Sequence, residues 1–229
     1  MKPLVVAIDG PAGAGKSTVS RRLAQALAYR YIDTGAMYRV IGVLAAEQRI
    51  DVTNDAALAA LCDHTKIEFV ESDGRVCTLV DGRDMSDIIR TPEAAQLASK
   101  TSTVPVVRER LVAMQRSMGA SGGVVMEGRD IGTVVFPNAP VKVFLDASPR
   151  ERAWRRASEM HDKVGDEELE RMTREIAERD ARDRGRAHSP LRPAEDALLL
   201  DTTKMKLDEV VRTLLEHIAT RAAALESHS

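Results

Sequence analysis

A short glycine-rich segment near the start of the chain restricts its possible folds more than any other feature. Residues 10–17, GPAGAGKS, match the phosphate-binding pattern G-x-x-x-x-G-K-[ST]. An apolar run at 4–8 precedes the segment as a buried strand, and an amphipathic run at 19–28 follows it as a helix. This order places backbone N–H groups and the positive end of a helix around a polyphosphate. The segment therefore predicts a site for a nucleoside triphosphate.

Each residue type in the segment has a chemical reason to bind a nucleotide. Glycines let the backbone wrap closely around phosphate, Lys16 is placed to reach the β- and γ-phosphates, and the Ser17 hydroxyl is placed to ligate Mg²⁺. The residues expected to contact the nucleotide are Gly10, Pro11, Ala12, Gly13, Ala14, Gly15, Lys16, Ser17 and Thr18. The alternative is a glycine-rich turn that matches the pattern by chance.

Composition narrows the class of protein. The 229 residues carry a formal net charge of −2, which argues against a general partner for nucleic acid or acidic membranes. Aromatic residues make up only 3%, too few for a platform on which single-stranded bases stack. Cys62 and Cys77 lie in apolar patterns and are expected to be buried thiols in a reducing compartment. No apolar run approaches the roughly 18 residues of a membrane span, so we expect a cytoplasmic protein.

Short β-rich runs alternate with helical patterns along the chain. The runs are 4–9, 31–34, 124–128, 141–146 and 198–201, and the clearest helical patterns are 36–46, 104–118, 167–183 and 207–224. Strands that alternate with helices form a parallel sheet with helices on both faces. We therefore expect an α/β fold of three layers, in a single domain spanning residues 1–229.

One region interrupts this alternation. Residues 67–70 and 76–80 are short alternating runs joined by a polar, glycine-containing segment, which predicts a hairpin. A short helical pattern follows at 92–99. We interpret residues 61–102 as a small subdomain inserted at the side of the sheet.

The segment 150–186 is dense in charge, with equal numbers of basic and acidic residues, as is typical of a solvated helix surface. Arg179, Arg182, Asp183 and Arg186 fit that interpretation less well. Their spacing of i, i+3, i+4 and i+7 puts them on one helix face if the helix reaches Arg186. Three guanidinium groups on one face repel one another unless an anion faces them. The alternative is a surface network of ion pairs.

Three classes of protein compete for such a chain: a small-molecule kinase, a GTPase or motor ATPase, and a regulatory nucleotide-binding module. Guanine recognition requires D-x-x-G after a strand and N/T-K-x-D. The single D-x-x-G, at 162–165, has no predicted strand before it, and N/T-K-x-D does not occur in the sequence. These patterns favour the kinase.

A kinase that phosphorylates a nucleotide must bring two anions together, and arginine suits this task because its planar fork binds phosphate through two hydrogen bonds. Arg39 and Arg129 follow predicted strand ends, where ligands bind in open parallel sheets. Arg108 is a further candidate.

Four motifs make a family resemblance specific. IDGPAGAGKST, DTGAMYR, GRDIGTVVFPNAPVKVFLDAS and ERDARDRGRAHSPL together resemble the bacterial cytidylate kinases, over about residues 5–202. The resemblance implies a parallel five-stranded core, a large nucleotide-monophosphate-binding insert and a lid, which we place at 155–165. It implies a monomer that transfers the γ-phosphate of ATP to CMP or dCMP. The subdomain at 61–102 lies where the insert belongs.

The same resemblance assigns roles to single residues. The residues implied to bind the phosphate of CMP are Arg39, Arg129 and Arg186. Those implied to contact its sugar are Arg179 and Asp183, and those implied to contact cytosine are Ser99, Arg108 and Asp130. Thr34, where some relatives have serine, joins the substrate-binding set. The expected catalytic residues are Lys16, Arg129 and Arg186.

Other roles stay open at this stage. Arg152, Arg155 and Arg156 begin the expected lid, where either contact with ATP or a place on the helix surface fits. Asp9 and Glu127 end strands near the P-loop and either hold water on Mg²⁺ or act structurally.

Alternatives also stay open for base recognition and for the whole chain. For base recognition, the alternatives are that Ser99 caps or ends its short helix and that Arg108 lies on a solvated helix face. For the chain, they are a P-loop kinase for another monophosphate or for a hydroxyl metabolite such as shikimate, and a non-enzymatic nucleotide-sensing module.

Overall fold

The chain forms two units, which we describe in turn. In the computed structural model, the described residues are 3–72, 74–159, 165–186 and 189–227. The first unit combines Met1–Arg30 with Ser121–Ser229, and the second is Tyr31–Ala120. Part of the expected lid at 155–165, residues 160–164, lies outside the described residues.

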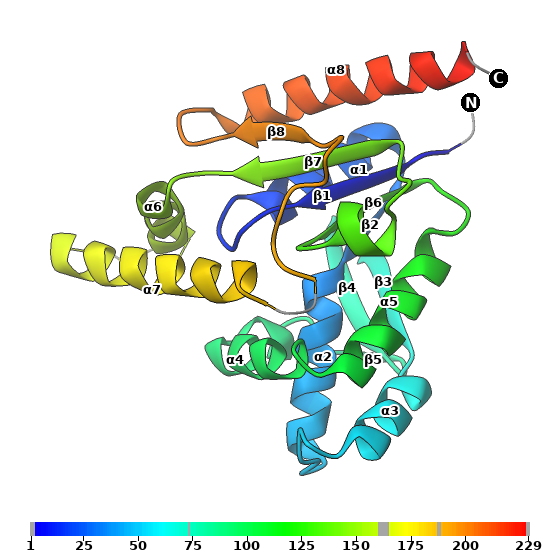
Figure 1. The fold of residues 1–229 in the computed structure, drawn as a ribbon, viewed down its shortest axis with the longest axis vertical. Helices are drawn as coiled ribbons and strands as arrows, with labels where there is room; N and C mark the ends of the chain where they lie inside the picture. The colour runs from blue at the N-terminus through cyan, green and yellow to red at the C-terminus, as the bar shows by residue number, and fades with distance from the viewer. Residues whose placement is uncertain (1–2, 73, 160–164, 187–188, 228–229) are drawn as a thin grey trace. The chain divides into compact units, whose positions relative to one another are not determined.

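Four strands of a five-stranded parallel sheet lie at the centre of the first unit (Figure 1). The strands lie in the order β2-β6-β1-β7-β8. Their bounds are Arg30–Asp33 for β2, Val124–Gly128 for β6, Val5–Asp9 for β1, Val141–Asp146 for β7 and Leu198–Asp201 for β8. The strand β2 starts at the last residue of the first unit. The structure thus confirms the α/β class and the parallel sheet.

The central strands are continuous apolar runs, as expected of strands that are covered on both faces. Val6 and Ile8 of β1 are fully buried, and so are Val125 and Met126 of β6 beside them. Because Asp9 pairs with Gly128 across the parallel ladder, the two strands end at the same edge. Asp146 pairs with Asp201 in the same way at the ends of β7 and β8.

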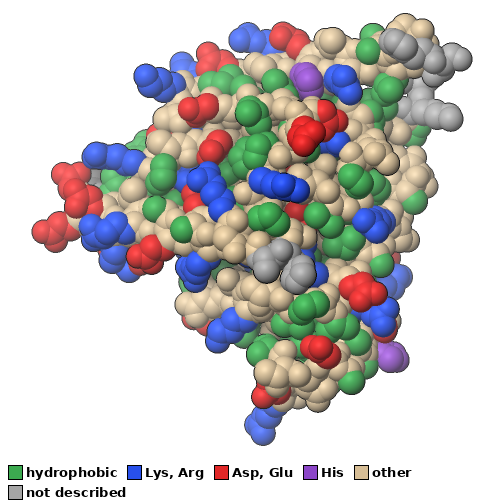
Figure 2. Space-filling view, viewed as in Figure 1, with side chains coloured by type: hydrophobic (Ala, Val, Ile, Leu, Met, Phe, Trp, Pro, Cys, Tyr) green, Lys and Arg blue, Asp and Glu red, His purple; other side chains and the backbone are tan. Residues whose placement is uncertain are grey.

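Among the described residues of the first unit, five helical segments accompany these strands. They are α1 (Lys16–Leu27), the π-helix η2 (Ile131–Val135), α6 (Pro149–Glu159), α7 (Asp166–Arg184) and α8 (Leu207–Glu226). Helices α1 and α8 lie side by side, and α6 packs on α7 (Figure 1). A small apolar cluster joins α6 to α7: Ala153, Ala157, Met172 and Ile176. The remaining surface of α7 carries interspersed basic and acidic side chains (Figure 2).

The second unit contains a three-stranded sheet and four α-helices among its described residues. The sheet has β3 (Ile67–Ser72), β4 (Arg75–Val80) and β5 (Arg83–Asp84), and β3 and β4 form the predicted hairpin. The helices are α2 (Thr34–Glu47), α3 (Asp55–His64), α4 (Pro92–Thr101) and α5 (Pro105–Gly119), with a short 3₁₀ turn, η1 (Ile88–Arg90). Helix α2 packs against α4 at Gly42, where a Cβ atom would lie 2.9 Å from Leu97.

Several sequence-based boundaries need correction. Thr34, predicted to end a strand, is the first residue of α2, because the Asp33 carboxylate caps that helix by accepting from Ala36 N at 2.9 Å. Helix α7 ends at Arg184, so Arg186 lies beyond the helix and not on its face. Helices α3 and α6 were not predicted. No helix in the described part of the chain is both long and apolar enough to span a bilayer.

Candidate functional site

The P-loop follows β1 and is shaped by contacts that only glycine allows. Gly10 and Gly13 have φ angles of 150° and 77°. A Cβ atom on Gly10 would lie 2.0 Å from the Leu145 carbonyl oxygen, and one on Gly13 would lie 3.2 Å from the Cβ of Arg152. Both positions therefore favour glycine for their backbone conformation, and Gly10 also lacks the space for a side chain. The loop is held closely between β1 and the segment that leaves β7.

The end of the loop presents the features that bind phosphate. Helix α1 begins at Lys16, after Gly15 in the left-handed conformation and without a side-chain cap. Its first N–H groups are therefore directed toward the site where an anion would bind. The buried Lys16 ammonium donates to the Pro11 carbonyl at 2.7 Å, inside the loop, while Ser17 is exposed.

Asp9, the last residue of β1, fixes the segment that follows β6. Its two carboxylate oxygens accept from the backbone N–H groups of Ile131 and Gly132, at 2.8 and 2.7 Å. Burial raises the pKa of Asp9 to about 6, although these two hydrogen bonds and Lys16 act in the opposite direction. Asp9 therefore anchors the start of the π-helix, which favours a structural role over holding water on a metal ion. Glu127 is also buried.

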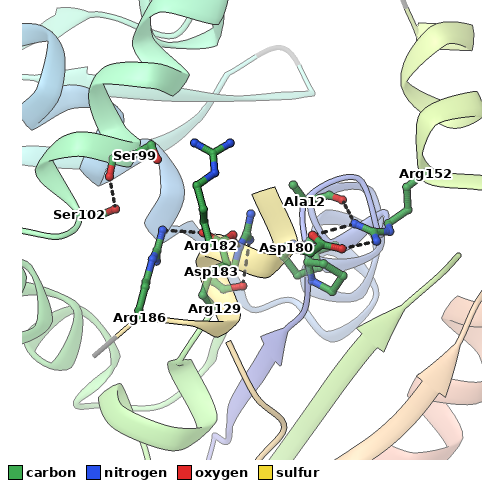
Figure 3. Close-up of polar contacts among 12 residues, drawn as sticks. Ala12, Ser99, Ser102, Arg129, Arg152, Asp180, Arg182, Asp183 and Arg186 are labelled. Carbon is green, nitrogen blue, oxygen red and sulfur yellow. Dashed lines mark hydrogen bonds and ion pairs between the residues drawn. The ribbon is translucent and has the colours of Figure 1, made fainter. Parts of the chain in front are cut away.

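Three charged residues form one cluster in the first unit (Figure 3). Asp183 on α7 is buried and pairs with Arg129 Nε at 3.2 Å and with Arg186 at 2.7 Å. Arg129 comes directly after β6, and Arg186 follows Gly185, the C-cap residue of α7. One carboxylate thus orients two guanidinium groups from different elements. We call this group the Arg129–Asp183–Arg186 cluster.

Arg179 shows that this cluster carries excess positive charge. Burial and the nearby guanidinium groups of Arg129, Arg156 and Arg186 lower the pKa of Arg179 to about 10, against the opposing effect of Asp183. Such repulsion is relieved when an anion binds. With two guanidinium groups and one carboxylate, the cluster carries a net positive charge.

Other arginines of the charged segment have different positions from those expected. Arg182 is exposed, and its Nε donates to a backbone carbonyl of its own helix at 3.4 Å. Arg152 is fully buried and is neither a surface residue nor free to reach a nucleotide. Arg155 bonds to Thr202 and Glu151, and Arg156 is exposed. The four residues 179, 182, 183 and 186 therefore do not act as one face.

Asp130 also belongs to the first unit. It is buried, and it directly precedes the π-helix that Asp9 anchors. Its backbone carbonyl accepts from Val134 and Val135, in bonds of 2.8 and 3.2 Å that close the first turn. π-Helical turns are rare and occur often at functional sites.

In the second unit, Arg39 is held by Asp33. An Arg39 nitrogen lies 2.8 Å from Asp33 Oδ2, while the other carboxylate oxygen of Asp33 caps α2. Gly35 lies beside this pair, and a Cβ atom there would be tight only against the Asp33 carboxylate, at 3.1 Å. Thr34 is buried beside them.

Ser99 and Arg108 lie near the junction of α4 and α5. Ser99 is inside α4, which continues to Thr101, and its carbonyl accepts from the Ser102 hydroxyl at 3.1 Å. Arg108 is buried and lies over the ring of Tyr38, 5.8 Å from its centre. The alternatives that Ser99 ends its helix and that Arg108 sits on a solvated face are therefore wrong.

The residues near the P-loop suit a magnesium ion held mainly by a nucleotide. Within the described residues, no group of three or more His, Cys, Asp or Glu side chains could hold a metal on its own. Mg²⁺ keeps several water ligands and is bound through one or two protein oxygens plus substrate phosphates. The exposed Ser17 hydroxyl at the start of α1 fits that type of site.

Comparison with known proteins identifies close relatives. The family model described as "Cytidylate kinase" matches residues 6–220. A cytidylate kinase of Syntrophotalea carbinolica is 50% identical over 96% of this chain and 94% of its own length. A cytidylate kinase of Serratia proteamaculans is 45% identical over 93% of each chain.

A solved structure supports the fold independently. A gluconokinase from Sinorhizobium meliloti is only 16% identical, yet it superposes with a TM-score of 0.54 over 100% of this chain and 98% of its own. At that identity the likeness concerns the fold alone.

Proposed function

The chain belongs to the cytidylate kinase family, and on this premise we propose that it transfers the γ-phosphate of ATP to CMP or dCMP. The products are ADP and CDP or dCDP. The observation that supports this most strongly lies in the first unit. There, the P-loop follows β1, and Arg129 follows β6, which ends at the same edge of the sheet. Asp183 of α7 joins Arg129 to Arg186 at that edge. Two phosphate-binding groups at one edge suit a donor and an acceptor that are both anions.

The donor site is the P-loop. Residues 10–18 would surround the phosphates of ATP with backbone N–H groups, and Lys16 would leave the Pro11 carbonyl to contact the β- and γ-phosphates. Ser17 would hold Mg²⁺ together with the phosphates. The ion, when bound, neutralises charge that develops on the phosphate oxygens.

The acceptor site uses arginines and polar side chains. Arg39, Arg129 and Arg186 would bind the phosphate of CMP, and Arg179 and Asp183 would bind the sugar. Ser99, Arg108 and Asp130 would read cytosine, and Thr34 would complete the substrate contacts. The charge repulsion around Arg179 supports an anion at this site.

The chemical step needs little besides positioning and charge neutralisation. An oxygen of the CMP phosphate attacks the γ-phosphorus, and the bond from that phosphorus to the β–γ bridging oxygen breaks as ADP leaves. Since the attacking oxygen is already an anion, no general base is required. Lys16, Arg129 and Arg186 stabilise the charge in transit, and exclusion of water prevents hydrolysis of ATP.

The organisation of the enzyme follows from the same proposal. Residues 61–102 would form the monophosphate-binding subdomain and 155–165 the lid of one kinase domain. We propose a cytoplasmic monomer that acts on small molecules and not on nucleic acid, in keeping with the near-neutral net charge and the free thiols of Cys62 and Cys77.

The test is release of ADP in a coupled assay across a panel of acceptors. The panel contains CMP, dCMP, UMP, AMP, GMP and shikimate. We expect turnover with CMP or dCMP that far exceeds turnover with the others. Preferred turnover with another acceptor would assign a different kinase, and no acceptor-dependent turnover at all would indicate a nucleotide-sensing module.

A further inference from the structure

Arg152 is one of the largest side chains that the protein buries completely. Only 1% of its side chain is exposed, although it lies in the first turns of the otherwise charged helix α6. A buried guanidinium is costly unless its N–H groups all find acceptors. The partners of this side chain therefore indicate why it is there.

The guanidinium group contacts three different parts of the first unit, and Figure 3 shows its contacts with two of them, Ala12 and Asp180. Its Nε donates to the Ala147 carbonyl at 2.8 Å, just after β7. One terminal nitrogen donates to the P-loop carbonyl of Ala12 at 2.9 Å and to Asp180 at 3.1 Å. The other terminal nitrogen bonds to the second oxygen of Asp180. The Cβ of Arg152 also packs on the P-loop at Gly13.

The pair of Arg152 and Asp180 lies next to the Arg129–Asp183–Arg186 cluster. The two aspartates are one helical turn apart on α7, and both are buried. Asp180 binds the arginine that holds the P-loop, whereas Asp183 binds Arg129 and Arg186. A single turn of α7 is thus fixed to the donor loop on one side and to the arginine cluster on the other.

We infer that Arg152 and Asp180 are positioning residues, which fix the P-loop at the correct place relative to the Arg129–Asp183–Arg186 cluster. This inference rests on the proposed function and deepens it. Phosphoryl transfer requires the attacking oxygen and the leaving oxygen to lie in line with the transferred phosphorus. The Arg152–Asp180 pair fixes the helix that carries Asp183 relative to the loop that carries ATP, and so it sets that alignment.

The contacts distinguish this role from direct binding of ATP. Arg152 has its donor groups committed to Ala12, Ala147 and Asp180, and it is closed off from solvent. It would have to break the pair to reach a nucleotide. Stability alone does not account for this pair either. Replacing a buried ion pair by apolar residues of similar volume often leaves the stability of a protein unchanged or raises it.

The test compares Arg152→Met with the double variant Arg152→Met/Asp180→Leu in the full chain. The control is Arg171→Met. It removes an arginine that forms exposed ion pairs with Glu168 and Glu175 on α7, the helix that also carries Asp180. We measure the melting temperature, kcat at saturating ATP and CMP, and KM for each substrate. Arg152→Met leaves Asp180 buried and unpaired, so its melting temperature falls. The double variant recovers the melting temperature.

The decisive readout is kcat. In Arg152→Met and in the double variant we expect kcat to fall about 100-fold, the effect expected when reacting groups are misplaced by roughly 1 Å. The Arg171→Met control should keep the wild-type kcat. If Arg152→Met does not fold, the double variant and Asp180→Asn, which keeps an acceptor oxygen, replace it. We expect Asp180→Asn to lower kcat less than Arg152→Met does.

Three results would overturn the inference. The first is a kcat that returns with the melting temperature in the double variant, which would mean a structural role. The second is a rise in KM for ATP alone, which would make Arg152 a ligand of ATP. The third is a folded Asp180→Asn variant with wild-type kcat. Absence of CMP-dependent turnover in the wild type and in Arg171→Met would instead contradict the proposed function.

Discussion

The P-loop and the Arg129–Asp183–Arg186 cluster, both in the first unit, prepare for phosphate in different ways. The P-loop uses one continuous segment, and its glycines and the start of α1 supply backbone N–H groups. The cluster uses side chains from the end of β6 and from the end of α7, joined by one carboxylate. The P-loop consists of consecutive residues, whereas the cluster forms only when folding brings distant parts of the chain together.

This difference has consequences for mutation. A backbone cradle cannot be altered one hydrogen bond at a time by changing side chains, so its sensitivity is concentrated in Lys16. In the cluster, more than one guanidinium group would contact the phosphate under the proposed function, so the loss of one would leave another in place. We therefore expect a steep response to change in the donor site and a graded response in the acceptor site.

The largest effect is expected for Lys16→Ala. Under the proposed mechanism the Lys16 ammonium meets the transferring phosphate, so we expect its removal to lower kcat by a factor on the order of 10³ or more. The variant still folds, since alanine is favourable at the start of a helix, and its melting temperature stays close to that of the wild type. Lys204→Ala, at an exposed site, is the control. Activity within tenfold of wild type would remove the P-loop from the mechanism.

Arg186→Ala tests the graded response of the acceptor site. We expect kcat/KM for CMP to fall roughly 10- to 100-fold, the loss of one charge-assisted contact in a desolvated site, while KM for ATP changes little. The matched control is Arg182→Ala, because Arg182 is exposed and lies outside the Arg129–Asp183–Arg186 cluster. Unchanged kinetics for CMP in Arg186→Ala would support a surface ion-pair network instead.

Asp130→Ala tests whether the acceptor site recognises the base as well as the phosphate. Cytosine offers an amino donor where uracil has a carbonyl, so a carboxylate acceptor favours cytosine. We expect kcat/KM to fall far more for CMP than for UMP. The preference for CMP over UMP, measured as the ratio of their kcat/KM values, should therefore decrease roughly 10-fold or more. Steady-state rates with both acceptors measure this. A parallel fall for the two bases would mean that Asp130 does not read the base.

Asp9→Asn gives a smaller, pH-dependent effect on stability. Because the pKa of Asp9 is raised from 3.8 to about 6 on folding, the folded chain binds more protons than the unfolded chain between those values. The contribution of Asp9 to the free energy of unfolding therefore falls as pH rises through that window and is constant above it, by roughly 3 kcal/mol at most.

Urea unfolding of wild type and Asp9→Asn at several pH values from about 4.5 to 7.5 measures this contribution. The difference in unfolding free energy should drift with pH in favour of the asparagine variant up to about pH 6 and then level off. A difference that is independent of pH would show that Asp9 titrates normally. The asparagine also changes the hydrogen bonds to Ile131 and Gly132, but that offset does not vary with pH.

Much of the fold was predictable because the signals are local. All five parallel strands were predicted within one residue of their observed ends, since each is an apolar run that stops at a polar residue or glycine. The hairpin of β3 and β4 was predicted from strict alternation around a turn. Helix α3 was missed because its apolar pattern is weak, although Asn54 caps it.

The contacts of Asp9 and Arg152 were not predictable in the same way. Asp9 meets Ile131 only because β1 and β6 are neighbours in the sheet, and Arg152 meets Asp180 across 28 positions in sequence. One signal was available in α7. Its buried positions are Met172, Ile176, Asp180 and Asp183. Two aspartates that continue an apolar stripe indicate buried charges that need cationic partners.

The most direct test of two separate phosphate sites is the pattern of initial rates when ATP and CMP are varied together. If the P-loop and the arginine cluster are filled at once and the phosphoryl group passes directly between substrates, double-reciprocal plots intersect. ADP then forms only when CMP is present. Parallel lines, or a burst of ADP without CMP, would reveal a phosphorylated enzyme intermediate. That result would contradict the account of a donor and an acceptor bound side by side.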